Sequence, residues 1–475
     1  MERQPFPKTT LVPFARTANM WDSLRNGRLS RTAAAIAIAL SVPVANAVEK
    51  LPTPSQANAI VVENCDDSGP GSLRDAVASA ASGDMIDLSQ LTCSMITLTS
   101  GAIEIPQDDL YLKYSGEGGT PPTIDGNDSS RVFHHTGSGT LKLVGLTITH
   151  GKYDNTNAPY AVSAAGGCIY SSGSVYLGAS TVTGCTARDT LGQDASGGGI
   201  YVDKVLTLQH SSVSANTATS TARFAEGGGA FAFGALDAYY SSIGGNVASG
   251  LAYLNFGGGI ALVSLSDSPS VIANSTISGN TADRGSGLMI VGGGTDSAAV
   301  AITNSTISGN TANVYSALYL RGPVTLIGST IAFNTSPSGP CIELASHTDP
   351  VQIESSILAG NGNGNVEYDI GSRGYPITIA GSHDLIVETS GSLTLPPDTI
   401  SADPLLSPLA DNGGPTATHA LGAGSPAIDA GDNVDAFSFD QRGSGYPRVS
   451  GAAADIGAFE STAGDTIFAD GFDGG

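Results

Sequence analysis

The chain has 475 residues, 43 acidic against 20 basic side chains and a formal net charge of −23. It has no cluster of lysine and arginine, which argues against nucleic acid as a partner, because binding to phosphate requires such clusters. Hydrophobic residues make up 40% of the chain, which argues against a disordered protein.

The first residues have the pattern of an export signal. Three arginines precede the apolar run 32–40, and the small residues Ala45 and Ala47 follow it. This pattern is typical of a secretory signal peptide over residues 1–47, cleaved between Ala47 and Val48. The run is too short to span a bilayer, and no later run is longer, so no transmembrane segment is expected after cleavage.

The one clear helical pattern follows in residues 48–145. Ser72 is expected to be the N-cap, Leu73 and Val77 to share the buried face, and Gly83 to end the helix. Short strand-like runs come after it. We expect this segment to form a cap and the first coils of a stack, because open strand edges need a cover.

Residues 146–360 contain an internal repeat. Its most regular mark is an asparagine that recurs 30, 34, 30 and 24 residues apart, at Asn216, Asn246, Asn280, Asn310 and Asn334. Gly-Gly pairs lie about midway between these positions, and runs such as Val-Leu-Thr-Leu have the alternation of strands. No repeat has a window with helical spacing. The pattern predicts an all-β parallel solenoid with coils of about 24–34 residues.

Coils in such a solenoid stack at the ordinary strand spacing of about 4.8 Å. The recurring asparagine of each coil then lies above that of its neighbour. Stacked amides can hydrogen-bond along the axis, so we expect a structural asparagine ladder that holds turns. The Gly-Gly pairs are expected to form the tight bends before the strands.

The five cysteines allow two disulfides in an exported protein. Cys65 and Cys93 flank the first structured segment, and closing that loop would contribute about 3 kcal/mol. A second, less favoured pair is Cys168 with Cys185, within one coil. This assignment leaves Cys341 as a buried thiol.

Residues 361–460 are expected to form the last coils and a C-terminal cap, and residues 461–475 a possible sorting tail. The cap is dense in charge. This density has two interpretations, an acid/base site or arginine–carboxylate pairs that fold the cap, and we favour the second. The residues concerned are Asp429, Asp440, Arg442, Arg448, Asp455 and Glu460.

Both ends of the expected stack resemble known sequences. Gly-Ser-Leu-Arg-Asp-Ala-Val at 71–77, followed by Gly-Asp-Met-Ile-Asp at 83–87, resembles the CSLREA-type N-terminal region of exported bacterial β-helix proteins. The motifs at 424–431, 440–443 and 455–460 resemble the choice-of-anchor Q domain. The resemblance implies a right-handed parallel β-helix with a pectin lyase-like fold. It also implies a protein that is secreted or held at the surface of a Gram-negative bacterium.

These observations favour an exported, surface-associated rod that acts in adhesion or as a structural or binding element. Surface glycans or cell-surface proteins are the partners we expect. The alternative is a carbohydrate-active β-helix, either a polysaccharide lyase or a glycoside hydrolase. A hydrolase needs two converging carboxylates, and a lyase needs a base and a cation to neutralise a uronate. The weak catalytic candidates are Asp203, Lys204, Asp237 and Asp283.

Two absences bear on this alternative. The acidic residues of the repeats do not recur at the same position of successive repeats. The only tryptophan lies in the leader, so an aromatic sugar platform would have to be tyrosine or phenylalanine, with Tyr239 and Tyr240 among the candidates. No cofactor is expected. Ca²⁺ between acidic coils is conceivable, but neither an EF-hand nor an acidic nonapeptide repeat occurs.

Overall fold

The computed structural model describes residues 59–462 except 117–118, 156–162, 252–253, 265–268, 293–298, 346–349, 364–367 and 373. The expected signal peptide, its cleavage site between Ala47 and Val48, and residues 463–475 of the tail lie outside the described residues. All described residues belong to one compact unit within Lys50–Gly475.

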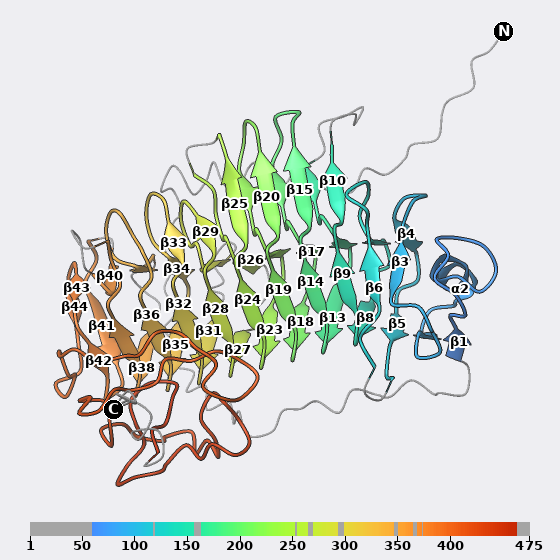
Figure 1. Ribbon diagram of the computed structural model, residues 1–475. Coiled ribbons are helices and arrows are strands. Elements are labelled where there is room, and N and C mark those ends of the chain that lie inside the picture. Colours follow the sequence, from blue (N-terminus) through green and yellow to red (C-terminus); the bar gives the residue numbers. More distant parts are fainter. Residues whose placement is uncertain are drawn as a thin grey trace, which may run out of the picture. The chain divides into compact units, whose positions relative to one another are not determined.

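The described chain winds into stacked coils whose strands form three long parallel sheets (Figure 1). Sheet 1 has 13 strands among the described residues, and its longer strands alternate between inward and outward side chains because successive residues of a strand face opposite sides. In stacking order they are β1 (Ala59–Val61), β2 (Met85–Asp87), β5 (Leu110–Lys113), β8 (Thr140–Val144), β13 (Ser174–Gly178), β18 (Leu206–Gln209), β23 (Leu236–Tyr239), β27 (Ser270–Ala273), β31 (Val300–Thr303), β35 (Val324–Ile327), β38 (Val351–Glu354), β41 (Ile377–Ala380) and β44 (Leu393–Thr394).

Sheet 2 follows sheet 1 in each coil and has 11 strands in the described part of the chain. Most of these strands have three residues, with a β-branched residue or leucine at the inward position. They are β3 (Met95–Thr97), β6 (Thr123–Asp125), β9 (Thr147–Thr149), β14 (Thr181–Thr183), β19 (Ser212–Ser214), β24 (Ser242–Gly244), β28 (Thr276–Ser278), β32 (Thr306–Ser308), β36 (Thr330–Ala332), β39 (Ile357–Ala359) and β42 (Leu385–Ile386).

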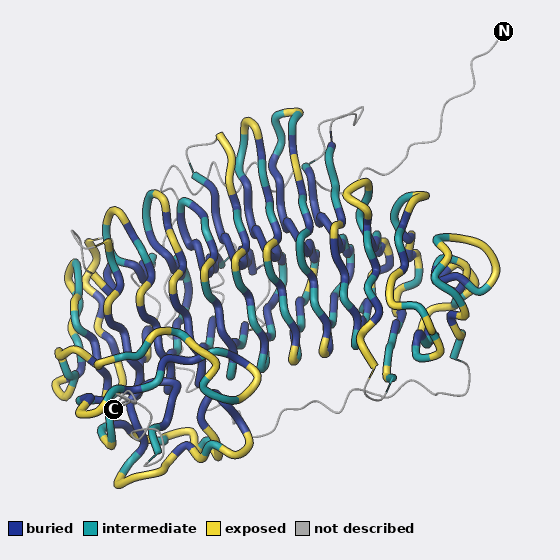
Figure 2. Tube along the Cα trace, in the orientation of Figure 1, coloured by how far each residue is buried: buried dark blue, intermediate teal, exposed yellow. Residues whose placement is uncertain are grey.

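Sheet 3 closes the coil and also has 11 described strands. The side chains that the three sheets point inward form one continuous apolar core, mostly of leucine, isoleucine and valine. Figure 2 shows that buried residues recur in coil after coil along the stack. The strands of sheet 3 are β4 (Ile103–Ile105), β7 (Phe133–His135), β12 (Ile169–Ser171), β17 (Ile200–Val202), β22 (Ala230–Ala232), β26 (Ile260–Ser264), β30 (Leu288–Gly292), β34 (Leu318–Arg321), β37 (Ile342–Leu344), β40 (Ile370–Ser372) and β43 (Thr389–Ser390).

The middle coils carry an extension between sheets 2 and 3, which we call the fin (Figure 1). Four alanines, at positions 218, 225, 248 and 282, form its small core. Its outgoing strands are β10 (Lys152–Asp154), β15 (Thr186–Asp189), β20 (Thr217–Ser220), β25 (Val247–Gly250), β29 (Thr281–Ala282) and β33 (Thr311–Ala312). The returning strands are β11 (Ala164–Ala165), β16 (Ala195–Ser196) and β21 (Ala225–Glu226).

The recurring asparagines form a buried ladder at the turn after sheet 2. Each donates from its backbone N–H and from Nδ2 to Oδ1 of the asparagine in the next coil, at 2.8 to 3.1 Å. The ladder continues past Asn334 to Asn361 and ends at Asp369, whose Oδ1 accepts both bonds. The asparagines therefore satisfy the turn and are not available to a ligand.

A second ladder, of serines, follows sheet 1. The backbone N–H of each serine donates to Oγ of the serine in the next coil at 3.1 to 3.2 Å. Its last member donates to Oδ1 of Asp384 at 3.2 Å. Sequence reasoning missed this ladder, although all its residues but Ser356 begin a Ser-Ser or Ser-Thr pair. The members are Ser180, Ser211, Ser241, Ser275, Ser305, Ser329 and Ser356.

The helix α2 (Leu73–Ser79) lies at the start of the stack, with Ser72 as its N-cap. It ends before Gly83, where the sequence analysis expected its end. The side chain of Gln107 donates to the carbonyls of Val77 and Ala80, which satisfies the helix terminus early. Gly83 instead adopts a φ of 91° in the turn that leads into β2.

Both expected disulfides are present. Cys65 pairs with Cys93 beside α2, and Cys168 pairs with Cys185 at the coil where the asparagine ladder begins. The backbone N–H of Cys185 donates to Oδ1 of Asn216, so a cystine precedes the first ladder asparagine. Cys341 is a buried free thiol.

Residues 397–462, which we call the C-terminal segment, have little regular structure and pack along the side of the coils (Figure 1). The amide of Gln441 bonds the outward hydroxyls of Thr276 and Thr306 on sheet 2. Asn274 and Asn304 donate to carbonyls of residues 439–441. The segment expected to form a cap therefore contacts coils from β27 onward laterally.

In the part of the chain that the structure describes, no helix is long and apolar enough to cross a membrane.

Candidate functional site

The structure distributes the four weak catalytic candidates over three parts of the coil. Asp203 and Lys204 lie in the turn between β17 and β18, where the Asp203 carboxylate accepts from the hydroxyl of Tyr201 and Lys204 donates to the carbonyl of Ser138. Asp237 lies on β23, on the outer face of sheet 1. Asp283 follows β29 in the fin, where it accepts from Asn255 at 2.8 Å. They do not form one site.

A buried carboxyl group lies at the base of the fin. Glu226 on β21 is 2% exposed, and burial raises its pKa to about 8. Its Oε2 accepts from Ser196 at 3.5 Å, whereas Oε1 has no hydrogen-bond partner among the described residues. Burial also raises the pKa of the neighbouring Asp194, which pairs with Arg223 at 3.3 Å. Because this cluster is closed to solvent, it does not offer a polysaccharide site.

The charged residues of the C-terminal segment pair with one another. Arg442 binds Asp440 through two nitrogens at 2.7 and 2.9 Å and lies over the ring of Phe459. Arg448 donates to the carbonyl of Asp455 and lies 3.9 Å from Glu460. These arginine–carboxylate pairs are buried, which supports their structural interpretation.

A partly exposed aromatic surface lies on the outer side of sheet 1. The strand register aligns Tyr111, Lys142, Tyr176, Thr207 and Asp237 in one column along the axis. A second column beside it contains Lys113, Val144, Gly178, Gln209 and Tyr239. We call these two columns, with the adjoining turn residues His210 and Tyr240, the tyrosine face.

The ring of Tyr176 lies flat against the sheet. A Cβ at position 178 would come within 3.0 Å of Cε1 and 3.3 Å of the hydroxyl oxygen of Tyr176, so the ring covers the space that Gly178 leaves. The hydroxyl is held by Oε1 of Gln209 in the next coil. The glycine and the glutamine together keep one face of the ring turned outward.

A second aromatic pair borders this platform. The rings of His210 and Tyr240 stack at 5.0 Å with an interplanar angle of 4°. The imidazole of His210 is exposed, and the equivalent residue one coil earlier is Ala179, whose methyl group is too small to cover it. Tyr240 lies against Gly443 of the C-terminal segment. The tyrosine face thus extends from the first coils to the edge of that segment.

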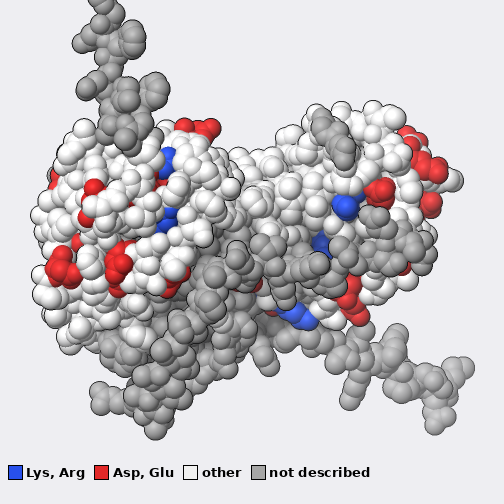
Figure 3. All heavy atoms as spheres, turned by 90° about the horizontal axis from the view of Figure 1, so that it is seen from below, with Lys and Arg blue, Asp and Glu red and all other residues white. Residues whose placement is uncertain are grey.

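Two lysines give the face a local positive charge. Lys142 lies between Tyr111 and Tyr176 in register, and Lys113 lies on the preceding strand. Neither ammonium group has a hydrogen bond or ion pair with the described residues. Asp237 is the only acid of the two columns over β5 to β23. In the view of Figure 3, charged side chains are few and most of the visible described surface is uncharged.

The other aromatic column is not available to a ligand. On sheet 3, Tyr170, Tyr201 and Phe231 stack at 5.2 and 5.5 Å. Tyr201 and Phe231 are only 5% and 2% exposed. Burial raises the pKa of Tyr201 well above its ordinary value. This stack packs the junction between sheet 3 and the fin.

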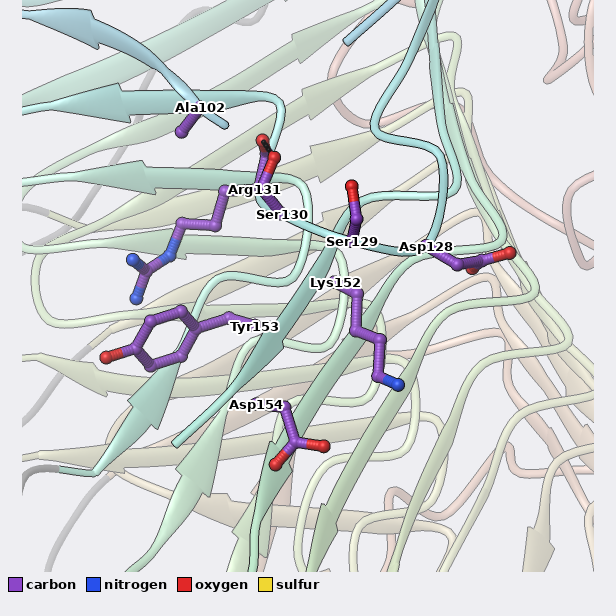
Figure 4. A pocket seen from close by; sticks show the side chains of 8 residues that line it. All are labelled: Ala102, Asp128, Ser129, Ser130, Arg131, Lys152, Tyr153 and Asp154. Carbon is purple, nitrogen blue, oxygen red and sulfur yellow. Dashed lines mark hydrogen bonds between the residues drawn. The ribbon is translucent and has the colours of Figure 1, made fainter. Parts of the chain in front are cut away.

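An open pocket of about 430 Å³ lies where β10 begins the fin (Figure 4). Arg131 occupies one side, but its guanidinium donates to the carbonyls of Ala165 and Gly166 and lies 3.4 Å from the ring centroid of Tyr153. Asp128, Lys152 and Asp154 supply charges of both signs. The pocket therefore favours no single class of ligand.

No group of three or more His, Cys, Asp or Glu side chains within the described ranges is arranged to hold a metal ion. Ca²⁺ binding stays an untested prediction.

No family model matches the chain, and no curated protein matches it. The solved structure of pectate lyase Pel9A is similar over 85% of this chain and 97% of that chain, with a TM-score of 0.47 and 16% identity. At this identity the likeness concerns the fold and not the activity. The expected parallel β-helix is confirmed by the strand order and the parallel pairing of the three sheets.

Sequence reasoning found only one end of the tyrosine face. Tyr239 and Tyr240 were named as replacements for tryptophan, but Tyr111, Lys142 and Tyr176 were missed because they precede Asn216, the first of the regularly spaced asparagines. A signal was present in the alternation of the strands. Aligning the inward leucines of the segments at 110–113, 140–144 and 174–178 would have placed the outward residues between them in one column.

Proposed function

We propose that this protein is an exported β-helix of the cell surface that acts in adhesion by binding glycans along the tyrosine face. The observation that carries the proposal is the Tyr176 ring, which lies flat over Gly178 with its hydroxyl held by Gln209. Amphipathic aromatic rings can cover the apolar face of a sugar while polar groups at their edge bond its hydroxyls.

The repeat of the coils suits a linear ligand. Tyr111 and Tyr176 are two coils apart, about 10 Å, and Tyr239 is two coils further, so the face extends about 19 Å along the axis. An extended polysaccharide advances by about one coil height per sugar residue. Successive aromatic side chains would then contact alternate sugars of one chain.

A carbohydrate-active enzyme is the second candidate, because the tyrosine face could also hold a substrate. A hydrolase requires two carboxylates roughly 5–10 Å apart, and this part of the face supplies Asp237 alone. The buried Glu226 is too enclosed to serve. Binding without cleavage is the function that the described groups support better.

Export and surface attachment rest on the sequence motifs. The signal-like leader, the CSLREA-like segment at 71–87 and the choice-of-anchor Q-like motifs between 424 and 460 support a surface protein of a Gram-negative bacterium. The two disulfides are compatible with an oxidising compartment.

Binding of the mature protein to immobilised neutral and acidic polysaccharides tests this function. We expect at least one polysaccharide to bind without being cleaved. Tyr176→Ala should weaken that binding about tenfold, because the stacking surface is lost. Gly178→Ala should also weaken it, because a Cβ there displaces the ring while the tyrosine remains.

Tyr368→Ala removes a tyrosine that is 39% exposed outside the face, and it should bind like the unchanged protein. Circular dichroism would verify that each variant is folded. If the folded protein bound no polysaccharide, or if both face variants bound as tightly as the control, the proposal would be wrong. Depolymerisation that is lost on changing Asp237 would establish the enzyme instead.

A further inference from the structure

We propose that the glycan bound by the tyrosine face is an acidic one, a polysaccharide whose sugars carry carboxylates. This inference rests on the proposed function and specifies its ligand. The feature that points to it is Lys142, which the register inserts between the two aromatic rings of Tyr111 and Tyr176. If one sugar stacks on Tyr111 and another on Tyr176, the sugar between them lies over Lys142.

The lysine is not engaged elsewhere. Lys142 and Lys113 lie on adjacent strands of sheet 1, are half-buried, and make no ion pair with any described acid. The chain has 43 acidic side chains against 20 basic ones, so an acidic partner for a lysine would be easy to supply. Lys142 has no acid in register on either neighbouring strand, whereas Lys113 has Asp87 on β2. An external carboxylate would pair with Lys142.

Partial burial strengthens such a contact. Lys142 is partly buried and lies in register between Tyr111 and Tyr176, and a lysine in such a place can bury its aliphatic stem while its ammonium group stays in water. A charge-assisted hydrogen bond to a carboxylate is stronger than one to a neutral hydroxyl. Discrimination between acidic and neutral glycans is therefore expected to come from Lys142, with Lys113 in support.

Gln209 adds a neutral donor to the same surface. Its Oε1 accepts from the Tyr176 hydroxyl, so the amide must present its N–H₂ group away from that bond. This group has no hydrogen-bond partner among the described residues. It is one coil from Tyr176 on the side opposite Lys142. A sugar stacked on Tyr176 would thus meet a cation on one side and an amide donor on the other.

The position of Asp237 limits the cationic part of the face. It lies three coils from Lys142 along the same column. A carboxylated chain is favoured over the first coils and disfavoured toward β23. This asymmetry distinguishes the face from a uniformly basic surface, which would bind any polyanion.

The test compares an oligogalacturonate with its methyl ester of the same length, which is neutral but otherwise similar. The unchanged protein should bind the acid at least about tenfold more tightly, and the preference should shrink as salt is raised. Lys142→Met should remove most of the preference and leave methyl ester binding unchanged. Lys142→Arg should retain part of it, because the charge is kept.

Lys152→Met is the matched control, because Lys152 lines the open pocket at β10, lies outside the tyrosine face and has no ion pair with another described residue. It should behave as the unchanged protein does. If Lys142→Met left the preference for the acid intact while Tyr176→Ala weakened the binding of both ligands, the proposed acidic specificity would be wrong and glycan binding would stand. If the unchanged protein bound neither ligand nor any other polysaccharide, glycan binding itself would be contradicted.

Polyglutamate and duplex DNA separate recognition of a sugar from attraction of any polyanion. Neither should compete with the oligogalacturonate at equal charge. If polyglutamate or DNA competed, and competed equally well with the Tyr176→Ala variant, the surface would be a non-specific electrostatic one and the inference would be wrong.

Discussion

At the scale of single residues, the two ladders end in aspartates. Asp369 accepts the last two bonds of the asparagine ladder, and Asp384 accepts the last bond of the serine ladder. Burial raises the pKa of Asp369 to about 6 and that of Asp384 to about 8, the latter with help from the charges of Glu354 and Asp398. Each ladder therefore ends in a group whose protonation is linked to folding.

The sign of this linkage follows from the direction of the shifts. Both pKa values are raised above the ordinary aspartate value of 3.8, so the folded protein holds these protons more tightly than the unfolded chain. Stability contributed by the neutral forms is present below about pH 4. It is lost as pH rises toward each folded pKa, at about 1.4 kcal/mol per pH unit for each group.

Asp384→Asn should therefore reduce the loss of stability between pH 6.5 and pH 8. The asparagine keeps an oxygen to accept from Ser356, and its amide group replaces Oδ2, which has no partner among the described residues. The free energy of unfolding, measured by denaturant titration at several pH values, checks this. Asp369→Asn is the control, because Asp369 is already ionised in this range. Parallel profiles for the unchanged protein and Asp384→Asn would contradict the assignment.

At the scale of elements, the asparagine ladder tests how the coils are held together. Asn280→Leu removes the acceptor of Asn246 and the donors to Asn310 inside the stack. Leaving these buried groups unsatisfied should cost about 1–3 kcal/mol. Denaturant unfolding measures this loss. Asn313→Leu changes an exposed asparagine of the fin and should cost much less, so equal stability of the two variants would contradict the structural role of the ladder.

The elements differ in how far the sequence could predict them. The asparagine ladder was predictable because one residue type recurs at coil spacing, and so was the N-cap Ser72. The fin was not, because its strands β16 and β21 have two residues each and its alanine core has no strong periodicity. The end of the asparagine ladder could not be predicted, because Asp369 follows Asn361 by only eight residues and so breaks the repeat spacing.

At the scale of the whole molecule, stacking brings the candidate site together. Tyr111, Lys142 and Tyr176 lie on three successive coils of sheet 1, separated by about 30 residues each. Their alignment depends on the register of every coil between them, and the irregular first coils lack the asparagine that marks the later ones. The fold could therefore be predicted from the repeat, whereas the tyrosine face required the coordinates.

The lateral position of the C-terminal segment also depends on distant contacts. Gln441 bonds Thr276 and Thr306, which lie 165 and 135 residues earlier in the chain. Its sequence shows paired charges but does not show which surface they cover. The segment packs mainly against coils from β27 onward and meets the tyrosine face at Tyr240, where its Gly443 lies.

The most direct test of the central claim is a crystal structure of the protein with a bound oligosaccharide from the polysaccharide panel. The account predicts a sugar chain along the axis on the outer face of sheet 1, with one ring stacked on Tyr176 and its neighbours directed toward Tyr111 and His210. An oligosaccharide bound only in the open pocket at Arg131 and Lys152, or on the fin, would contradict it.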